Sequence, residues 1–466
     1  MDLIRSSATD LLSALSTGRL TSEALMEATL DRVASVNPSV NAIVALRDRE
    51  TLLREARAAD AASDRGPLHG LPIAVKDLEN VAGVPTTMGS PFFANFVPEK
   101  DGLLPSRLRA AGAIPIGKTN VPEFGIGSHT FNPVYGATSN PYHPELTCGG
   151  SSGGAAVALA TGMIALADGS DEMGSLRNPA AWNNVYGFRP GWGTVPLNPE
   201  GDLFLHQLAT LGPMARSPSD IGILLDVIAG ADRRVPLSVD SPPCSPVRPA
   251  DLAGLRIGWL GDWGGAYPIE AGILDICESG LRVMEALGAI VEPVAAPMDS
   301  DKIWQAWIDL RSWGKAATLE PLLRQDPSML KDTAVWEIER GLKLSAMDVH
   351  RASVSRSAWF RRSLELFETY DALVLPTVQV WPFDMNVPYP LEIAGRTMDT
   401  YHRWMEVTIP IGLIGLPALA VPAGFGAAGV PMGFQIFGPR GSDARLLAIG
   451  EAYHLATEWP QKRPAM

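Results

Sequence analysis

Apolar residues in the first part of the chain recur at the spacing of amphipathic helices. After Thr21, whose hydroxyl suits a helix N-cap, they fall at i, i+4 and i+7. We expect this helix to end at Asn37-Pro38, because proline interrupts the hydrogen-bond ladder. A second amphipathic helix, rich in Ala, Arg and Glu, is predicted over residues 48–62. The pattern therefore predicts an N-terminal helical segment over residues 1–65.

From Gly66 onward, short apolar runs alternate with helical stretches. The apolar runs predict buried strands, and the stretches between them predict helices. The predicted strands are 71–75, 113–117, 164–167, 255–260 and 372–375, and the predicted helices are 104–111, 153–161 and 270–287. Such alternation favours an α/β fold in which a sheet is covered by helices on both faces.

A segment rich in Pro and Ser, residues 236–250 (PLSVDSPPCSPVRPA), is the best candidate for an internal boundary or a long surface loop. The chain that follows is strongly helical over 302–369. Because strands are predicted on both sides of the segment, we expect them to share one sheet. The prediction is a single domain over 1–466, with core parts at 66–235 and 371–466 and a largely helical insertion at 236–370.

Composition and charge limit the kinds of binding partner and the cellular location that we expect for this protein. The net charge of −13 disfavours nucleic acid, because phosphate binding needs a basic surface. No run of about 18 uncharged apolar residues predicts a membrane span, and the N-terminal residues lack the pattern of a secretory signal. Cys148, Cys244 and Cys277 are widely spaced with no metal-ligand pattern, which indicates reduced, structural thiols in a cytoplasmic protein.

Three polar features interrupt the apolar pattern. Lys76 ends an apolar run, and burial there would lower its pKa and make it a base. The small residues of Gly149-Gly-Ser-Ser-Gly-Gly154 lead straight into a helical segment, so they present hydroxyls and amides rather than form a linker. The segment 169–177 (GSDEMGSLR) predicts a turn whose amides converge on one oxygen beside Ser175, as in an oxyanion hole.

These features lie in blocks that resemble the amidase signature family. GPLHGLPIAVKD and GVPTTMGS resemble its lysine block, and GAIPIGKTNVPEF resembles the block that follows. CGGSSGGAAVALATGMIALADGSDEMGSLRNPAA resembles the signature itself, and LIGLPALAVPAGF and GVPMGFQIFGPR resemble the C-terminal blocks. The resemblance covers most of the chain and is weakest between about 230 and 370. It implies a large mixed β-sheet and amide hydrolysis that needs no metal or organic cofactor.

Carried over residue by residue, the resemblance implies a catalytic triad. Lys76 corresponds to the base, Ser151 to the bridging serine with its cis peptide bond, and Ser175 to the nucleophile. Other positions correspond to an oxyanion hole of backbone amides and to the residues that brace it. The amides are those of Glu172, Met173, Gly174 and Ser175, and the bracing residues are Asp171 and Arg177.

The substrate is the least specified part of this prediction. The family usually has two glycines before the nucleophile, preceded by a small or branched residue, whereas this chain has Glu172 and Met173 there, which we expect to reshape the acyl pocket. Seven of the twelve tryptophans fall between residues 304 and 404, where they would pack in the helical region or line a pocket. We expect a small hydrophobic or aryl amide or anilide. Carbamates (urethanes) and esters are alternatives that share the acylation chemistry.

Three further interpretations stay open. Gly149-Gly-Ser151-Ser-Gly153 matches the G-x-S-x-G elbow of α/β-hydrolases, which would make Ser151 the nucleophile and require a late histidine. The candidates for that histidine are His350, His402 and His454. Residues 112–119 match a P-loop, although a strand is predicted there. Within the family, a glutamine-hydrolysing amidotransferase subunit is the third. A stand-alone hydrolase is favoured, with a homodimer as one assembly to test.

Overall fold

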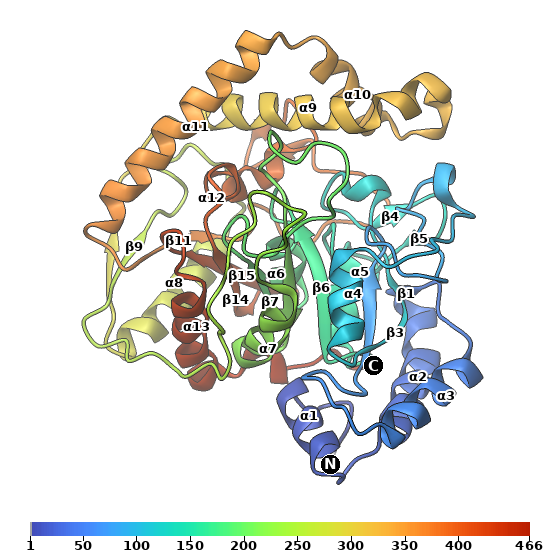
Figure 1. Ribbon diagram of the computed structural model, residues 1–466. Helices are drawn as coiled ribbons and strands as arrows, with labels where there is room; N and C mark the ends of the chain where they lie inside the picture. The colour runs from blue at the N-terminus through green and yellow to red at the C-terminus, as the bar shows by residue number, and fades with distance from the viewer. Residues whose placement is uncertain (1) are drawn as a thin grey trace.

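One mixed sheet of eleven strands forms the centre of the protein in a computed structural model that describes residues 2–466 (Figure 1). The strands are β1 (Ile43–Val44), β2 (Pro72–Lys76), β3 (Ile114–Thr119), β6 (Leu166–Asp171), β7 (Tyr186–Arg189), β8 (Thr210–Ala215), β9 (Arg256–Trp259), β10 (Ile290–Pro293), β11 (Ala372–Pro376), β14 (Ala418–Phe425) and β15 (Pro431–Phe437). Their order is β1-β3-β2-β6-β8-β7-β14-β15-β11-β9-β10. β2 runs parallel to β3 and β6, whereas β6 and β8 are antiparallel.

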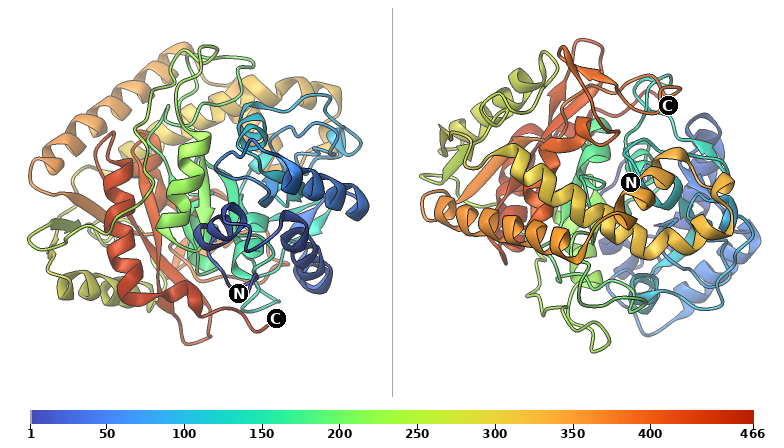
Figure 2. Two further views of the ribbon diagram at one scale, coloured as in Figure 1. Left: turned by 60° about the horizontal axis from the view of Figure 1, so that its bottom comes forward. Right: turned by 90° about the horizontal axis from the view of Figure 1, so that it is seen from above.

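Helices cover both faces of this sheet (Figures 1 and 2), as expected. They are α1 (Ala8–Ser16), α2 (Ser22–Val40), α3 (Arg49–Ala61), α4 (Leu103–Ala110), α5 (Gly153–Ala160), α6 (Arg177–Trp182), α7 (Pro218–Ile228), α8 (Ile273–Ala286), α9 (Ser300–Gln325), α10 (Asp332–Leu342), α11 (Ala346–Phe367), α12 (Ile409–Leu413) and α13 (Asp443–Thr457). Two small hairpins, β4 (Phe131–Asn132) with β5 (Gly136–Ala137) and β12 (Glu392–Ile393) with β13 (Arg396–Thr397), lie outside the sheet.

Helices α9, α10 and α11 form an arch across one end of the sheet, at the top of Figure 1. Figure 2, seen from above, shows them lying over the strand ends. The segment 236–370 also supplies β9 and β10, which extend the sheet at one edge, so it contributes strands as well as helices. Because strands before and after the Pro-rich segment share one sheet, we keep the single domain as a proposal, which limited proteolysis tests.

The observed elements begin and end within a few residues of the predicted positions, and two of the differences have a clear physical reason. Helix α2 continues past Pro38 to Val40, because the proline stands in its last turn, where few hydrogen bonds remain to be lost. Strand β6 covers 166–171 rather than 164–167, because every residue from Leu166 to Asp171 pairs with β8. The turn that carries Ser175 is correspondingly shorter than the sequence suggested.

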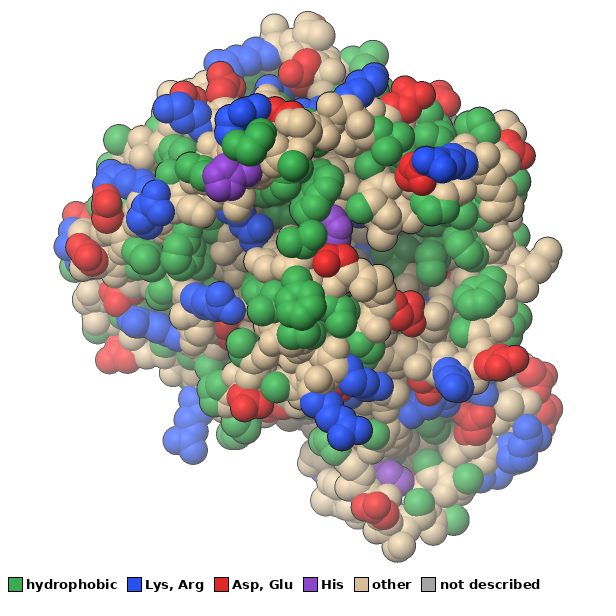
Figure 3. All heavy atoms as spheres, turned by 45° about the horizontal axis from the view of Figure 1, so that its top comes forward, with side chains coloured by type: hydrophobic (Ala, Val, Ile, Leu, Met, Phe, Trp, Pro, Cys, Tyr) green, Lys and Arg blue, Asp and Glu red, His purple; other side chains and the backbone are tan. Residues whose placement is uncertain are grey.

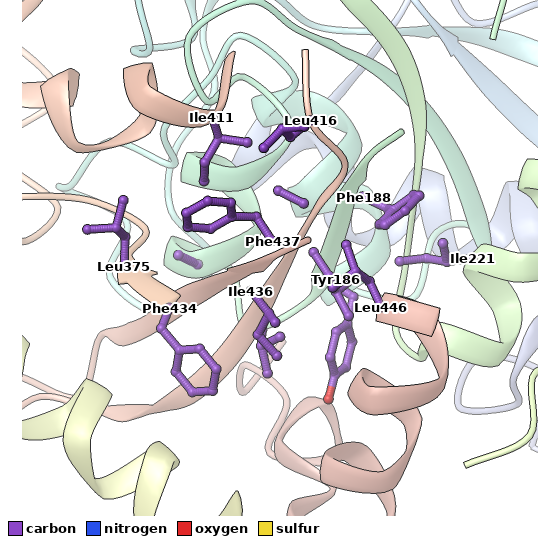
Figure 4. Packing of buried hydrophobic residues seen from close by; sticks show 14 of the residues in the cluster. Tyr186, Phe188, Ile221, Leu375, Ile411, Leu416, Phe434, Ile436, Phe437 and Leu446 are labelled. Atoms are coloured by element: carbon purple, nitrogen blue, oxygen red, sulfur yellow. The ribbon is translucent and has the colours of Figure 1, made fainter. Parts of the chain in front are cut away.

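A continuous apolar core holds the sheet between its helices. In Figure 4, Tyr186 and Phe188 of β7 lie near Leu446 of α13, and Phe434 and Phe437 of β15 fill the neighbouring space. These side chains are at most 1% exposed. Full burial of one such side chain stabilises a fold by roughly 1.5–3 kcal/mol. The strands that carry the polar features thus belong to a tightly packed platform.

None of the helices among residues 2–466 combines the length and the apolar character that a bilayer crossing requires.

Candidate active site

Lys76, the last residue of β2, points into a cluster of three hydroxyls. Its Nζ atom lies 2.8 Å from the Oγ atoms of Ser151, Ser152 and Ser170, and the residue is 1% exposed. Burial lowers the pKa of this amine to about 7, although the Asp168 carboxylate acts in the opposite direction. A large share of the amine is therefore neutral near physiological pH, as a general base requires.

Sequence reasoning missed Ser152 and Ser170 in this cluster. Ser152 directly follows the serine that the family resemblance pointed to, so its position gave a weak indication. The sequence pattern places Ser170 in the turn, whereas it lies in β6, next to β2 in the sheet. A prediction that this strand extends to Asp171 would have placed Ser170 next to Lys76.

The glycine–serine turn before α5 approaches neighbouring backbone closely. The Gly150–Ser151 peptide bond is cis, and Gly149 has φ 80°. A Cβ atom added at Gly153 would lie 2.2 Å from Thr130 Oγ1, and one added at Gly154 would lie 2.3 Å from the Asn120 backbone nitrogen. Only glycine fits at these two positions, and the fit places the Ser151 hydroxyl beside Lys76.

Asp171, at the end of β6, organises the turn that carries Ser175. Its carboxylate accepts hydrogen bonds from the backbone N–H groups of Gly174 at 3.0 Å and Leu176 at 3.2 Å. Arg177 and Arg189 form ion pairs with it at 2.9 and 3.2 Å. Burial alone would raise the pKa of Asp171, but the two guanidinium groups hold it well below its ordinary value. The turn is thus tied to the sheet by an ionised, fully buried carboxylate.

Three of the four backbone amides expected to form an oxyanion hole are open. Among residues 2–466, the N–H groups of Glu172, Met173 and Ser175 have no hydrogen-bond partner, whereas that of Gly174 donates to Asp171. Open amides within one tight turn suit the stabilisation of a negatively charged oxygen.

The Ser175 hydroxyl lies at the edge of this arrangement. The residue is 7% exposed, and its carbonyl accepts a hydrogen bond of 3.2 Å from the Ser152 amide. Its Oγ atom has no hydrogen-bond partner within residues 2–466. The Lys76–Ser151 pair is therefore in direct contact, while the hydrogen bond from Ser175 to Ser151 is not formed in this structure.

Glu172 is held from the opposite side, by the arch. Its carboxylate lies 2.9 Å from Lys315 Nζ and 3.3 Å from Arg311, both on α9. Arg311 also pairs with Glu337 of α10 at 2.9 Å. Burial would raise the pKa of Glu172, but Lys315 and Arg311 lower it below its usual range. Glu172 therefore joins the Ser175 turn to helices that are far away in the sequence.

The two motif alternatives lack structural support. His402 lies 2.6 Å from Glu337, His454 lies 3.2 Å from the Tyr186 hydroxyl, and neither contacts Ser151. His350 is exposed on α11. The P-loop match forms strand β3, whose Lys118 is buried 3.8 Å from Asp77. Across residues 2–466, no three His, Cys, Asp or Glu side chains are grouped to hold a metal ion.

A cavity of about 270 Å³ lies beside Glu172, between the arch and the loop 192–209. Trp313 lines it and contacts His206 with ring centroids 4.4 Å apart. Figure 3 shows apolar side chains gathered around a hollow on this side of the molecule. Trp307, Trp359 and Trp404 are instead fully buried in the core, so the tryptophans divide between packing and pocket.

Comparisons with known proteins cover nearly the whole chain. The family model described as Amidase matches residues 24–447. An acylamidase of Rhodococcus erythropolis is 34% identical, over 98% of this chain and 97% of the relative. One subunit of the glutamyl-tRNA(Gln) amidotransferase of Thermus thermophilus is 35% identical, over 92% and 93%. The crystal structure of a bacterial aryl acylamidase of the amidase signature family superposes with a TM-score of 0.91 at 26% identity, over 98% and 99%.

Proposed function

The chain belongs to the amidase family, and on that premise we propose that it hydrolyses small amides to an acid and an amine through an acyl-serine intermediate. The proposed nucleophile is Ser175, the proton relay is Ser151, and the base is Lys76. The observation that carries the assignment is the contact of 2.8 Å between Lys76 Nζ and Ser151 Oγ, in a site that lowers the pKa of the amine to about 7.

The mechanism follows from moving one proton along this relay. Ser151 passes its proton to neutral Lys76 and accepts the proton of Ser175, whose oxygen attacks the amide carbonyl. The open amides of Glu172, Met173 and Ser175 donate to the resulting oxyanion. The relay then returns a proton to the departing amine, and the C–N bond breaks. Water attacks the acyl-serine by the same path and releases the acid.

We propose hydrophobic or aryl amides as the substrates. Tryptophan side chains in the cavity wall support an apolar group next to Glu172. An acylamidase and an aryl acylamidase among the similar proteins support the same class. Carbamates and esters stay as alternative substrates of the same site. A panel of an aliphatic amide, an anilide, a carbamate and an ester separates them, because the ratio of kcat/KM values ranks the classes directly.

The assignment of the triad is tested by substitution. Ser175→Ala should abolish turnover, because nothing else in the relay can form the acyl intermediate. Lys76→Ala should lower kcat by several orders of magnitude, and an active-site-directed phosphonate should label Ser175 and not Ser151. Full activity of either variant, or labelling of Ser151, would refute the assignment.

The amidotransferase alternative has an experiment of its own. A similar relative is described as one subunit of such an enzyme. A stand-alone hydrolase should act on anilides without any partner protein, whereas glutaminase activity that needs added subunits would favour the alternative. Light scattering of the purified protein tests the proposed homodimer, and fractionation of cells tests the proposed cytoplasmic location.

A further inference from the structure

The cavity next to Glu172 contains a cation whose charge no carboxylate balances. Arg356 of α11 lines the cavity, and no Asp or Glu oxygen among residues 2–466 lies within 4.0 Å of its nitrogens. Its one hydrogen bond in this structure joins a guanidinium nitrogen to the Gln207 carbonyl at 2.8 Å. Burial lowers the pKa of Arg356 to about 10, and no neighbouring acid opposes that effect.

Two other cations lie at or near the cavity, and each is paired with a carboxylate. Burial lowers the pKa of Arg189 to about 10, and the nearby guanidinium groups of Arg177 and Arg356 lower it further against the effect of Asp171. Lys315 faces the cavity while it pairs with Glu172. Lys315 and Arg356 are the two Lys or Arg residues of the lining, and of these only Arg356 has no carboxylate partner among residues 2–466.

The walls of the cavity are otherwise largely apolar. They include Trp192, Val195, Leu208, Leu310 and Trp313. Two acidic residues of the lining, at positions 200 and 202, lie on the exposed loop, where water and salt screen them. A small, largely apolar chamber that contains one unpaired guanidinium group matches a ligand that is apolar along its length and anionic at its tip.

We propose that this cavity binds an apolar group ending in a carboxylate, with Arg356 as the anion contact. Glu172 connects this site with the reaction, because its backbone amide is open beside Ser175 while its side chain lines the cavity. If the protein is an amide hydrolase, as proposed above, its preferred substrates are amides with an aryl or alkyl arm that carries a carboxylate. Four of the five N–H groups of Arg356 have no acceptor among residues 2–466 and can donate to that carboxylate.

A binding experiment tests the site without turnover. Phenylacetate and its neutral analogue phenylethanol are titrated by calorimetry into the parent protein and into Arg356→Met. The parent should bind phenylacetate about tenfold more tightly than phenylethanol, and Arg356→Met should remove that difference, since a charge-assisted hydrogen bond is worth about a factor of ten or more. Arg361→Met, an exposed arginine on the same helix outside the cavity, should bind both probes like the parent.

Each contrary outcome is informative. If the parent binds neither probe, or binds both equally, the proposal is wrong. If Arg356→Met weakens both probes by the same factor, Arg356 only fastens the loop through Gln207, and the proposal is also wrong.

A kinetic comparison separates this inference from the proposed function. Acetanilide and its para-carboxylate are compared by kcat/KM. The parent should prefer the carboxylate, and Arg356→Met should lose the preference through KM with kcat nearly unchanged. Hydrolysis of neither anilide would count against the proposed function, while the calorimetric result would still decide whether the anion site exists.

Discussion

Asp171 and Glu172 are adjacent carboxylates that two different parts of the molecule neutralise. Asp171 is paired with Arg177, on the helix directly after the turn, and with Arg189, on strand β7 of the sheet. Glu172 is paired with Arg311 and Lys315 of the arch. The first pair is fully buried, whereas the Glu172 side chain keeps 19% of its surface exposed and faces a cavity. We infer that the core fixes the turn itself and that the arch adjusts its substrate side.

The largest expected effect comes from Asp171→Asn. Removing the charge leaves two buried guanidinium groups without their carboxylate partner. Breaking a buried ion pair typically lowers the free energy of unfolding by about 3–5 kcal/mol. The variant should lose several degrees in melting temperature and most of its activity together. Asp232→Asn is the matched control, because it removes the partner of Arg234, whose side chain is exposed, unlike those of Arg177 and Arg189. Its melting temperature should equal that of the parent. An Asp171→Asn protein of unchanged stability would remove the distinction between the two carboxylates.

Glu172→Gln should affect activity more than stability. The neutral side chain loses its ion pair with Lys315. The Glu172 backbone amide is then held less firmly in the position from which it donates to the oxyanion. We expect a fall in kcat of about tenfold, smaller than the loss from deleting one oxyanion donor, with a melting temperature close to that of the parent. Glu320→Gln removes the carboxylate that pairs with the exposed Arg324 on the same helix and should leave kcat unchanged. A drop in stability as large as that of Asp171→Asn would contradict the comparison.

The pH profile sharpens the comparison further. Protonated Lys76 cannot act as a base, so kcat/KM of the parent should fall as the pH drops below about 7, the pKa to which burial lowers this amine. Asp171 raises this pKa and Lys315 lowers it. The acid limb should therefore move to lower pH in Asp171→Asn and to higher pH in Lys315→Met. Shifts in the same direction for both variants would show that the limb belongs to another group.

The smallest effect is expected at ion pairs outside both regions. Arg234→Ala breaks a pair whose arginine side chain is 57% exposed, and such pairs contribute about 0–1 kcal/mol. Thermal melting should hardly change, and added salt should remove any difference from the parent.

The parts of the site that depend on local sequence could be predicted. Lys76 ends an apolar strand, the small residues 149–154 open a helix, and Asp171 lies within six positions of Arg177, so pattern and family resemblance were enough to bring them together. The strands β2 and β6 could be predicted as well, because each contains a short apolar run.

The link to the arch could not be predicted, because it depends on long-range packing. Glu172 meets Arg311 across the fold, and no periodicity in either segment indicates which of many charged residues will pair. The position of Ser170 depends on where β6 stops pairing with β8, a tertiary property that its small, turn-like neighbours conceal. Arg356 was equally inconspicuous, because its missing counter-ion is visible only in three dimensions.

The three hydroxyls around Lys76 have a consequence for the direction of proton movement. A charged ammonium donates three hydrogens, one to each of Ser151, Ser152 and Ser170. Once neutral, the amine has two hydrogens and a lone pair, so one hydroxyl must turn and donate to it. Ser152 Oγ also faces the Ser170 amide at 3.4 Å, which favours its remaining an acceptor. Reorienting hydrogens alone can therefore adapt the contacts between Lys76 and its three hydroxyls to either charge state of the amine, with Nζ and the three Oγ atoms at rest.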